Sequence, residues 1–114
     1  MSDQPLNALA GQTALVTGGA RRIGAEIVRI LHAAGANVAI HCHRSGKEAE
    51  ALCAELEALR PGSAAVFSAD LLDIATLAPL VNAVVARFQG LQLLVNNAST
   101  FYPTPFGSVT LPAW

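Results

Sequence analysis

The chain has 114 residues, of which 53% are hydrophobic and 13% are charged, and its formal net charge is -1. This length suits one domain with a core, but it is shorter than a complete doubly wound sheet usually needs, so we expect part of the domain to be missing. The near-neutral charge and the scattered basic residues exclude a nucleic-acid-binding protein. The high apolar fraction is typical of α/β proteins whose central strands are buried on both faces.

The first residues do not resemble a targeting segment. Asp3 and Gln4 disagree with the charged-then-apolar pattern of a secretion signal, and no apolar run is long enough to span a bilayer. We therefore expect a cytoplasmic protein without a membrane partner. In that compartment Cys42 and Cys53 are expected to be reduced, partly buried thiols rather than a disulfide.

After a polar leader over residues 1–11, residues 13–17 predict a buried first strand, and a glycine-rich stretch over 17–24 follows it. Gly18 allows a tight turn that a pyrophosphate can approach, and the N–H groups of the first helical turn point at such a ligand. Gly24 lets the helix and the sheet pack closely. Because the glycines lie between a strand and a helix, this stretch predicts a dinucleotide site.

Arg22 stands where the common dinucleotide fingerprint has a third glycine. A fixed cation at that position suggests additional negative charge on the ligand. The alternative is that Arg21 and Arg22 are two solvated charges at a helix start. Since the helix macrodipole disfavours cations there, a functional role for at least one of them is favoured.

The next elements follow from apolar spacing and from turn residues. An amphipathic helix that ends at Gly35 is predicted by apolar residues at three- and four-residue spacing, namely Ile23, Ile27, Ile30, Leu31 and Ala34. Residues 37–41 predict a second strand. Ser45 and Glu48 have the spacing of a capping box, and the helix that they begin runs to Arg60, before a Pro-Gly pair.

A third strand is predicted over 64–68, Asp73 can cap a third helix over 75–88, and a fourth strand covers 91–95. Residues 96–114 are rich in Ser, Thr and Pro and are predicted to be a loop.

This alternation indicates an α/β fold, the N-terminal part of a doubly wound parallel-sheet Rossmann fold, with residues 1–114 as part of a single domain. The expected strand order is 3-2-1-4, which leaves the fourth strand with an unpaired edge and an uncovered apolar face. We expect the isolated segment to aggregate or to remain partly molten.

The end of the second strand indicates which dinucleotide is bound. An Asp or Glu there would select the 2′-hydroxyl of NAD, but residues 41–45 are His, Cys, His, Arg and Ser. These groups suit a 2′-phosphate, which predicts NADP(H). A metal site is disfavoured, because His41 and His43 would share a face of the strand while Cys42 points away. For His41 a satisfied surface histidine remains an alternative.

These residues resemble the short-chain dehydrogenase/reductase family: the stretch 17–24, Asp70 after the third strand, and Asn96-Asn97-Ala98 after the fourth. Within the family, Arg22, the His43-Arg44-Ser45 triplet and above all the run over 96–105 look like pteridine reductases. Most relatives have a glycine at the position of Ser99. The similarity covers nearly the whole chain.

The resemblance implies a cofactor site for NADP(H). The pyrophosphate would be contacted by Gly18, Arg22 and Ile23. The 2′-phosphate would be held by His43, Arg44 and Ser45, and the adenine would be contacted by Asp70 and Leu71.

The same resemblance implies a pterin substrate. Asn97 and Ala98 would lie beside the ribose and nicotinamide, and Ser99 would touch both a cofactor phosphate and the pterin. Phe101 would stack on the pterin and hold it against the nicotinamide, an orientation suited to hydride transfer. Arg22 would also reach the substrate.

Structural alternatives remain open for several of these residues. Asp70 could begin the cap of the third helix, Asn96 and Asn97 could satisfy backbone groups in a turn, and Phe101 could be a core anchor beneath the loop.

The resemblance also implies a catalytic tyrosine whose pKa is lowered by a lysine four residues later. The chain cannot form this pair, because its single tyrosine is Tyr102, Phe106 lies four residues on, and Lys47 belongs to the second helix. We therefore expect the catalytic residues beyond Trp114 and this chain alone to be inactive.

The intact protein is expected to be an NADPH-dependent reductase of pterins or dihydropterins, and a homo-oligomer. The alternatives are a short-chain reductase of a carbonyl substrate and a non-catalytic NADP(H)-binding fragment.

Overall fold

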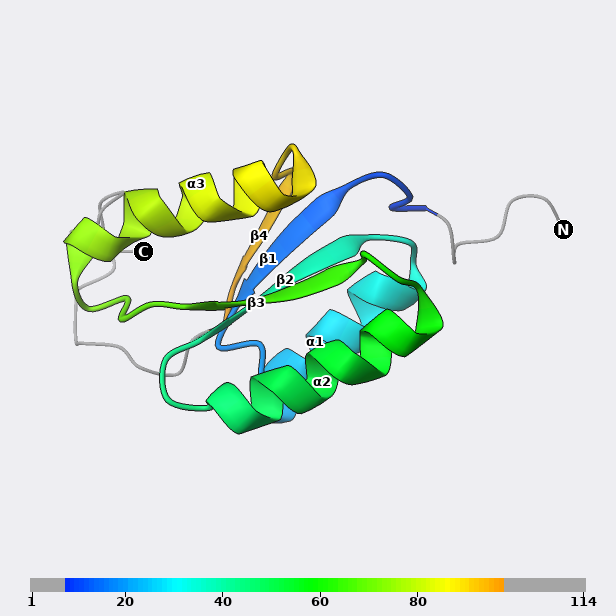
Figure 1. Cartoon of the computed structure of the whole chain (residues 1–114), viewed down its shortest axis with the longest axis horizontal. Coiled ribbons are helices and arrows are strands. Elements are labelled where there is room, and N and C mark those ends of the chain that lie inside the picture. The colour runs from blue at the N-terminus through cyan, green and yellow to red at the C-terminus, as the bar shows by residue number, and fades with distance from the viewer. Residues whose placement is uncertain (1–7, 98–114) are drawn as a thin grey trace, which may run out of the picture.

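The computed structural model describes residues 8–97. In chain order its elements are β1 (Thr13–Thr17), α1 (Arg22–Ala33), β2 (Asn37–Cys42), α2 (Gly46–Leu59), β3 (Ala64–Ser68), the 3-10 helix η2 (Ile74–Thr76), α3 (Leu77–Phe88) and β4 (Leu93–Asn96). The strands form one parallel sheet in the order β3-β2-β1-β4, which confirms the predicted topology. Helices α1 and α2 cover one face of the sheet and α3 covers the other (Figure 1).

Two apolar cores lie on the two faces of the sheet. Val16 and Ile40 contribute to the core beneath α1 and α2, whereas Leu15 and Ala39 contribute to the core beneath α3. Successive side chains of a strand point to opposite faces, so every residue of the central strand β1 is buried. This arrangement explains the high apolar fraction and the scarcity of charge.

The buried side of α1 agrees with the prediction only in part. Ile23 and Ile30 are 70% and 66% exposed, and the buried residues of the helix are Gly24, Ala25, Val28 and His32. Small side chains at the start of α1 let the helix lie close to the strand ends, and this close approach selects the buried face. Ile23 and Ile30 therefore point away from the sheet, whereas Ile27 and Leu31 of the predicted apolar set pack against the core beneath α1 and α2.

Some helix and strand ends in the structure also differ from the predicted ones. Ser45 is the N-terminal flanking residue of α2, but its side chain makes no capping hydrogen bond, so the predicted capping box is not formed. Asp73 does accept a hydrogen bond from the Ala75 N–H at 3.1 Å, although the first turn is the 3-10 helix η2. Strand β2 extends to Cys42, and β4 begins at Leu93.

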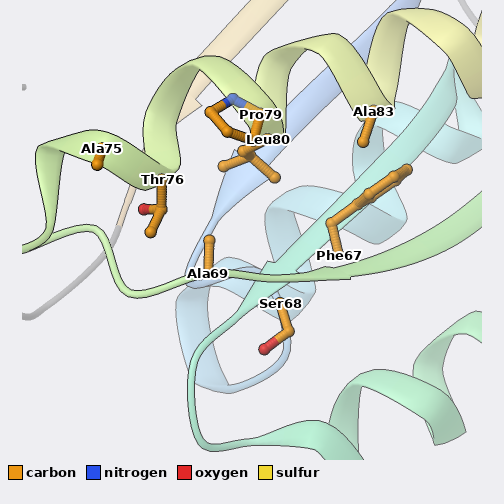
Figure 2. Close-up of a pocket in the computed structure, with 8 residues that line it drawn as sticks. All are labelled: Phe67, Ser68, Ala69, Ala75, Thr76, Pro79, Leu80 and Ala83. Carbon is orange, nitrogen blue, oxygen red and sulfur yellow. The ribbon is translucent and has the colours of Figure 1, made fainter.

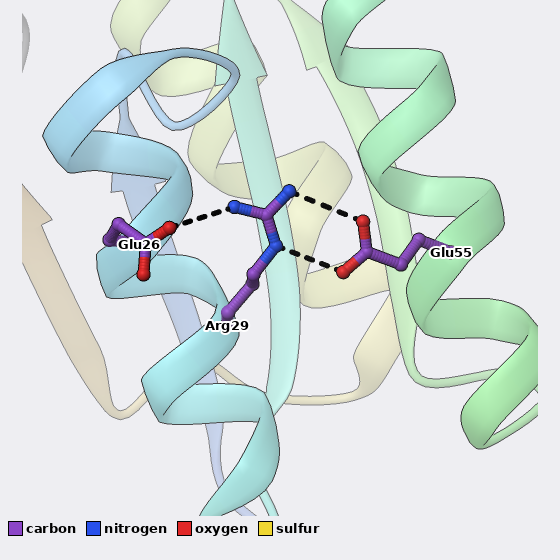
Figure 3. Close-up of polar contacts among 3 residues, drawn as sticks. All are labelled: Glu26, Arg29 and Glu55. Atoms are coloured by element: carbon purple, nitrogen blue, oxygen red, sulfur yellow. Dashed lines mark hydrogen bonds and ion pairs between the residues drawn. The ribbon is translucent and has the colours of Figure 1, made fainter.

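An ion pair joins the two helices on the same face. Arg29 of α1 donates to both carboxylate oxygens of Glu55 in α2, at 2.9 and 3.2 Å, and to Glu26 at 3.1 Å (Figure 3). The hydrogen bonds from Arg29 lower the pKa of Glu55. Because the three side chains are largely exposed, these contacts add only about 0.5 kcal/mol to stability.

Several apolar side chains of β4 and α3 are open to solvent within the described part of the chain. Leu94 is 52% exposed on β4, and Val81 and Val85 are 40% and 41% exposed on α3. Strand β4 pairs with β1 along one edge, and no described strand pairs with its other edge. The predicted open edge is therefore present in residues 8–97.

Two further observations bear on the chemistry of the chain. Cys42 is buried and Cys53 is half-buried, both are free thiols, and burial raises the pKa of each. Among the helices that the structure describes, none is long and apolar enough to cross a membrane.

Candidate functional site

The carboxyl ends of the four parallel strands lie at one edge of the sheet, and the described loops after β1, β2 and β3 begin at this edge (Figure 1). The predicted site residues in the described part of the chain lie in these loops or at the start of α1. The predictions for Ala98, Ser99 and Phe101 lie outside the described residues.

The glycine-rich turn between β1 and α1 has the predicted form. Gly18 has a φ of +61°, in the left-handed region that glycine adopts without strain. A Cβ on Gly24 would collide with the Gly18 carbonyl oxygen and would lie 2.5 Å from Asn97 Nδ2. The turn, the first turn of α1 and the end of β4 therefore come together only because residue 24 has no side chain.

Some backbone N–H groups in this turn already have a hydrogen-bond acceptor within the described part of the protein, and others do not. Those of Gly18 and Gly19 donate to the side chain and the backbone of His41, each at 3.0 Å. The first helical hydrogen bond runs from Ala25 N–H to Arg21 O, at 3.3 Å, so the N–H groups of Arg22 and Ile23 precede it and have no acceptor within the helix. The donors that an anion could use are those of the α1 start, and Gly18 supplies room rather than a hydrogen bond.

Arg22 begins α1 with a φ of 53° and an exposed side chain. This left-handed conformation costs a non-glycine residue about 1–2 kcal/mol, which explains why glycine is common at the position. The first turn of α1 contains no acidic residue, and Arg21 makes no side-chain cap. The positive end of the helix dipole and two guanidinium groups thus lie at the same place, an arrangement that attracts anions.

The loop after β2 carries the predicted 2′-phosphate residues. His43 and Arg44 are exposed and Ser45 is half-buried. His43 Nε2 lies 4.0 Å from Asp70 Oδ2, so the loops after β2 and β3 approach each other. Within residues 8–97, no acidic side chain forms an ion pair with Arg44.

Asp70 has a structural partner as well as its predicted role. Its Oδ1 accepts a hydrogen bond from the Leu72 N–H at 3.0 Å, the pattern of an Asx-turn, while the capping role belongs to Asp73. Leu71 is half-buried against the core beneath α3. One carboxylate oxygen of Asp70 thus shapes the loop, and the other faces His43.

Asn97 holds the end of β4 against the glycine-rich turn. Its N–H donates to Thr17 Oγ1 at 2.8 Å, and its Nδ2 donates to Gly18 O at 3.3 Å. The side chain therefore satisfies a backbone group in the glycine-rich turn, as the structural alternative predicted.

His41 is the residue whose position sequence reasoning missed. It is 3% exposed, and its two ring nitrogens contact the glycine-rich turn and the end of β3. The alternative of a surface histidine is wrong, because parallel pairing places this side chain between two neighbouring strand ends. Strand alternation was the sequence signal for the direction of the His41 side chain. By itself it does not show which residues of the neighbouring strands lie beside His41.

A cavity of about 330 Å³ lies between the end of β3 and α3, and Figure 2 shows the residues that line it. Phe67, Ala69 and Leu80 make it largely apolar. The Thr76 hydroxyl lies 2.8 Å from the carbonyl oxygens of Asp70 and Asp73, so it is engaged with the loop. None of the predicted cofactor residues lines this cavity.

Comparison with known proteins agrees with this geometry. Residues 12–114 match the family model for short chain dehydrogenases. Pteridine reductase 1 of Leishmania tarentolae is 42% identical over 109 residues, covering 81% of this chain and 38% of that protein. The short chain dehydrogenase/reductase AacuN of Aspergillus aculeatus is 40% identical over 103 residues, covering 90% of this chain and 38% of the relative.

A third relative is hydroxynaphthalene reductase arp2 of Aspergillus fumigatus, 36% identical over 103 residues, covering 90% of this chain and 37% of that protein. The chain thus spans less than two-fifths of the length of each of these three relatives. Because the family model covers nearly the whole sequence, the chain belongs to the short-chain dehydrogenase/reductase family, and it resembles pteridine reductase.

Proposed function

We propose that the protein containing this chain is an NADP(H)-dependent reductase of pterins or dihydropterins. Members of the family bind NAD or NADP. The observation that carries the choice of NADP(H) is the loop after β2, where the exposed His43 and Arg44 precede the half-buried Ser45 and no carboxylate takes the ribose-binding position. A dianionic 2′-phosphate suits this loop better than a neutral hydroxyl does.

The residues present fit such a cofactor. The free N–H groups at the start of α1 and the Arg22 guanidinium suit its pyrophosphate, and the Asp70 loop lies beside the ribose-binding loop. When bound, the nicotinamide supplies a hydride. The part of the chain described here binds and orients the cofactor, and we propose that the proton donor lies beyond residue 114, since the chain is short relative to its relatives.

The pterin substrate is supported by the 42% identity to pteridine reductase 1 and by the run of residues 96–105. A second candidate is reduction of a carbonyl substrate. It is supported by the similarity to a protein named hydroxynaphthalene reductase, and it would keep the same cofactor residues. A non-catalytic NADP(H)-binding fragment is the third candidate, and it gains weight if the purified protein has the 11.8 kDa mass of this chain.

Steady-state assays of the full-length protein separate these candidates. Dihydrobiopterin and a panel of ketones are each offered with NADPH and with NADH, after the intact mass has been measured. Turnover of dihydrobiopterin with NADPH at a kcat/KM at least about tenfold above every ketone is the expected result. Turnover of a ketone alone would favour the carbonyl reductase, and nucleotide binding without turnover would favour the non-catalytic protein.

Replacing Arg22 by glycine should separate stability from cofactor binding. Glycine relieves the left-handed strain, so the free energy of unfolding should stay equal or rise by up to about 1 kcal/mol. Loss of the guanidinium should raise the Kd for NADPH about tenfold. Urea denaturation and isothermal titration calorimetry measure the two effects.

Arg21→Gly is the matched control, because Arg21 has a φ of -139° and no strain to relieve. A Kd for NADPH that is unchanged in Arg22→Gly would assign Arg22 to the solvated surface.

A further inference from the structure

His41 connects the loops that form the candidate cofactor site. The Gly18 N–H donates to His41 Nδ1 at 3.0 Å, and His41 Nε2 lies 2.8 Å from the carbonyl oxygen of Ala69, directly before Asp70. The backbone carbonyl of His41 also accepts the Gly19 N–H at 3.0 Å. One buried residue therefore fixes the glycine-rich turn against the end of β3, and its own strand leads into the loop that contains His43.

The two ring contacts require one protonation state. Nδ1 must carry a lone pair to accept the Gly18 N–H, so the proton is on Nε2, which donates it to the Ala69 carbonyl. The imidazole is therefore neutral. A second proton on Nδ1 would turn the acceptor into a donor that faces another donor, and the Gly18 N–H would lose its partner.

Burial and the neighbouring His43 also oppose protonation of His41. Burial lowers the pKa of His41, the hydrogen bond to Ala69 raises it less, and the nearby His43 lowers it further. On the adjoining loop Asp70 faces His43, and Arg21 and Arg22 follow the glycine-rich turn. Among the residues of α3, which covers this face, the one charged side chain is Arg87 in the last turn.

An apolar residue of similar size would fill the space but would not reproduce this function. It would leave the Gly18 N–H and the Ala69 carbonyl without partners in a buried place, which is unfavourable unless the backbone shifts. A shift of the glycine-rich turn moves the start of α1, where the free N–H groups lie.

We propose that neutral His41 is a positioning residue for the nicotinamide cofactor, which holds the glycine-rich turn in the geometry that accepts the pyrophosphate. This proposal rests on the dinucleotide-binding role of the family and not on the choice of substrate. It makes cofactor affinity depend on pH through a side chain that does not touch the cofactor.

Two variants of the full-length protein each remove one of the two hydrogen bonds of the His41 ring and keep the other. In His41→Asn the amide oxygen can replace Nδ1 as acceptor for Gly18 but does not reach Ala69. In His41→Gln the amide nitrogen can replace Nε2 as donor to Ala69 but leaves Gly18 unpaired. Each variant loses one hydrogen bond, so their melting temperatures should fall by similar amounts.

Calorimetric titration with NADP⁺ at pH 7.5 should distinguish these variants. We expect the Kd to rise about tenfold in His41→Gln and to stay within about threefold of the wild type in His41→Asn. Equal Kd values in the two variants at matched loss of melting temperature would overturn the positioning role.

The pH profile of the wild-type protein tests the same proposal without a folding change. His41 is neutral in the complex and protonation opposes binding, so the Kd for NADP⁺ should rise as the pH falls from 7.5 through the free-state pKa, which lies below about 6.5. All other titratable groups are the same in both proteins, so the difference between wild type and His41→Asn isolates His41. Identical profiles would contradict the proposal.

Binding of the wild type to neither NADP⁺ nor NAD⁺ would instead overturn the cofactor site itself. In that case the positioning role of His41 would also be lost. Binding of the wild type with no difference among the variants would overturn the role of His41 alone.

Discussion

Replacing Gly24 by alanine should lower the free energy of unfolding by about 3 kcal/mol and weaken binding of the nicotinamide cofactor by at least about tenfold. The new Cβ would collide with the backbone carbonyl of Gly18 and lie 2.5 Å from Asn97 Nδ2, so either the turn or the end of β4 must move. The gain in helix propensity, about 1 kcal/mol, is too small to offset this collision. Urea denaturation and calorimetric titration with NADP⁺ measure the two losses.

Gly46→Ala is the matched control, because a Cβ on Gly46 meets nothing within 4 Å at the start of α2. This variant should keep its cofactor affinity and gain up to about 1 kcal/mol of stability from helix propensity. If Gly24→Ala unfolds at the same urea concentration as Gly46→Ala, the close packing of the turn is not essential.

Much of the fold could be predicted because local signals agreed with each other. Strand alternation and helix spacing located all the major elements, and the glycine-rich stretch was placed between the first strand and the first helix. The order β3-β2-β1-β4 was expected from the doubly wound architecture that the alternation of strands and helices indicates, and the structure confirms it. Each of these signals depends only on residues that are close together along the chain, so a single sequence is enough to find them.

The orientation of α1 could not be predicted in the same way. The helix has two overlapping apolar stripes, one with Ile23 and Ile30 and one with Ala25 and Val28. Hydrophobicity favoured the larger side chains, whereas the close approach at Gly24 selected the smaller ones. The distance between helix and sheet decides such a case, and sequence spacing does not give that distance.

The site shows a similar division. Gly18 and Asn97 were recognisable from their motifs, and the structure brings them together. The contacts of His41 depend on the register of β2 against β1 and β3, which pairs His41 with Phe67 and places it beside the end of β1. A histidine that joins two neighbouring loops has no signature along the chain, because its partners are 23 and 28 residues away.

The second large effect is expected from Arg44→Glu. If the loop after β2 holds the 2′-phosphate, this change replaces attraction by repulsion, and the Kd for NADPH should rise about a hundredfold. The Kd for NADH should change by less than about threefold, because its ribose carries a neutral hydroxyl. The ratio of the two values, measured by calorimetry at one ionic strength, reports cofactor preference independently of stability.

Lys47→Glu provides the matched control for this reversal. Lys47 is exposed in the first turn of α2, only three positions further along the chain, so the variant changes the net charge of the protein by the same amount. If Arg44 contacts the 2′-phosphate, Lys47→Glu should raise the Kd for NADPH far less than Arg44→Glu does. Raising the salt concentration should reduce the difference in Kd between the two variants. If Arg44→Glu weakens NADPH and NADH equally, or if both variants act alike, Arg44 does not select the 2′-phosphate, and cofactor preference must come from elsewhere in the site.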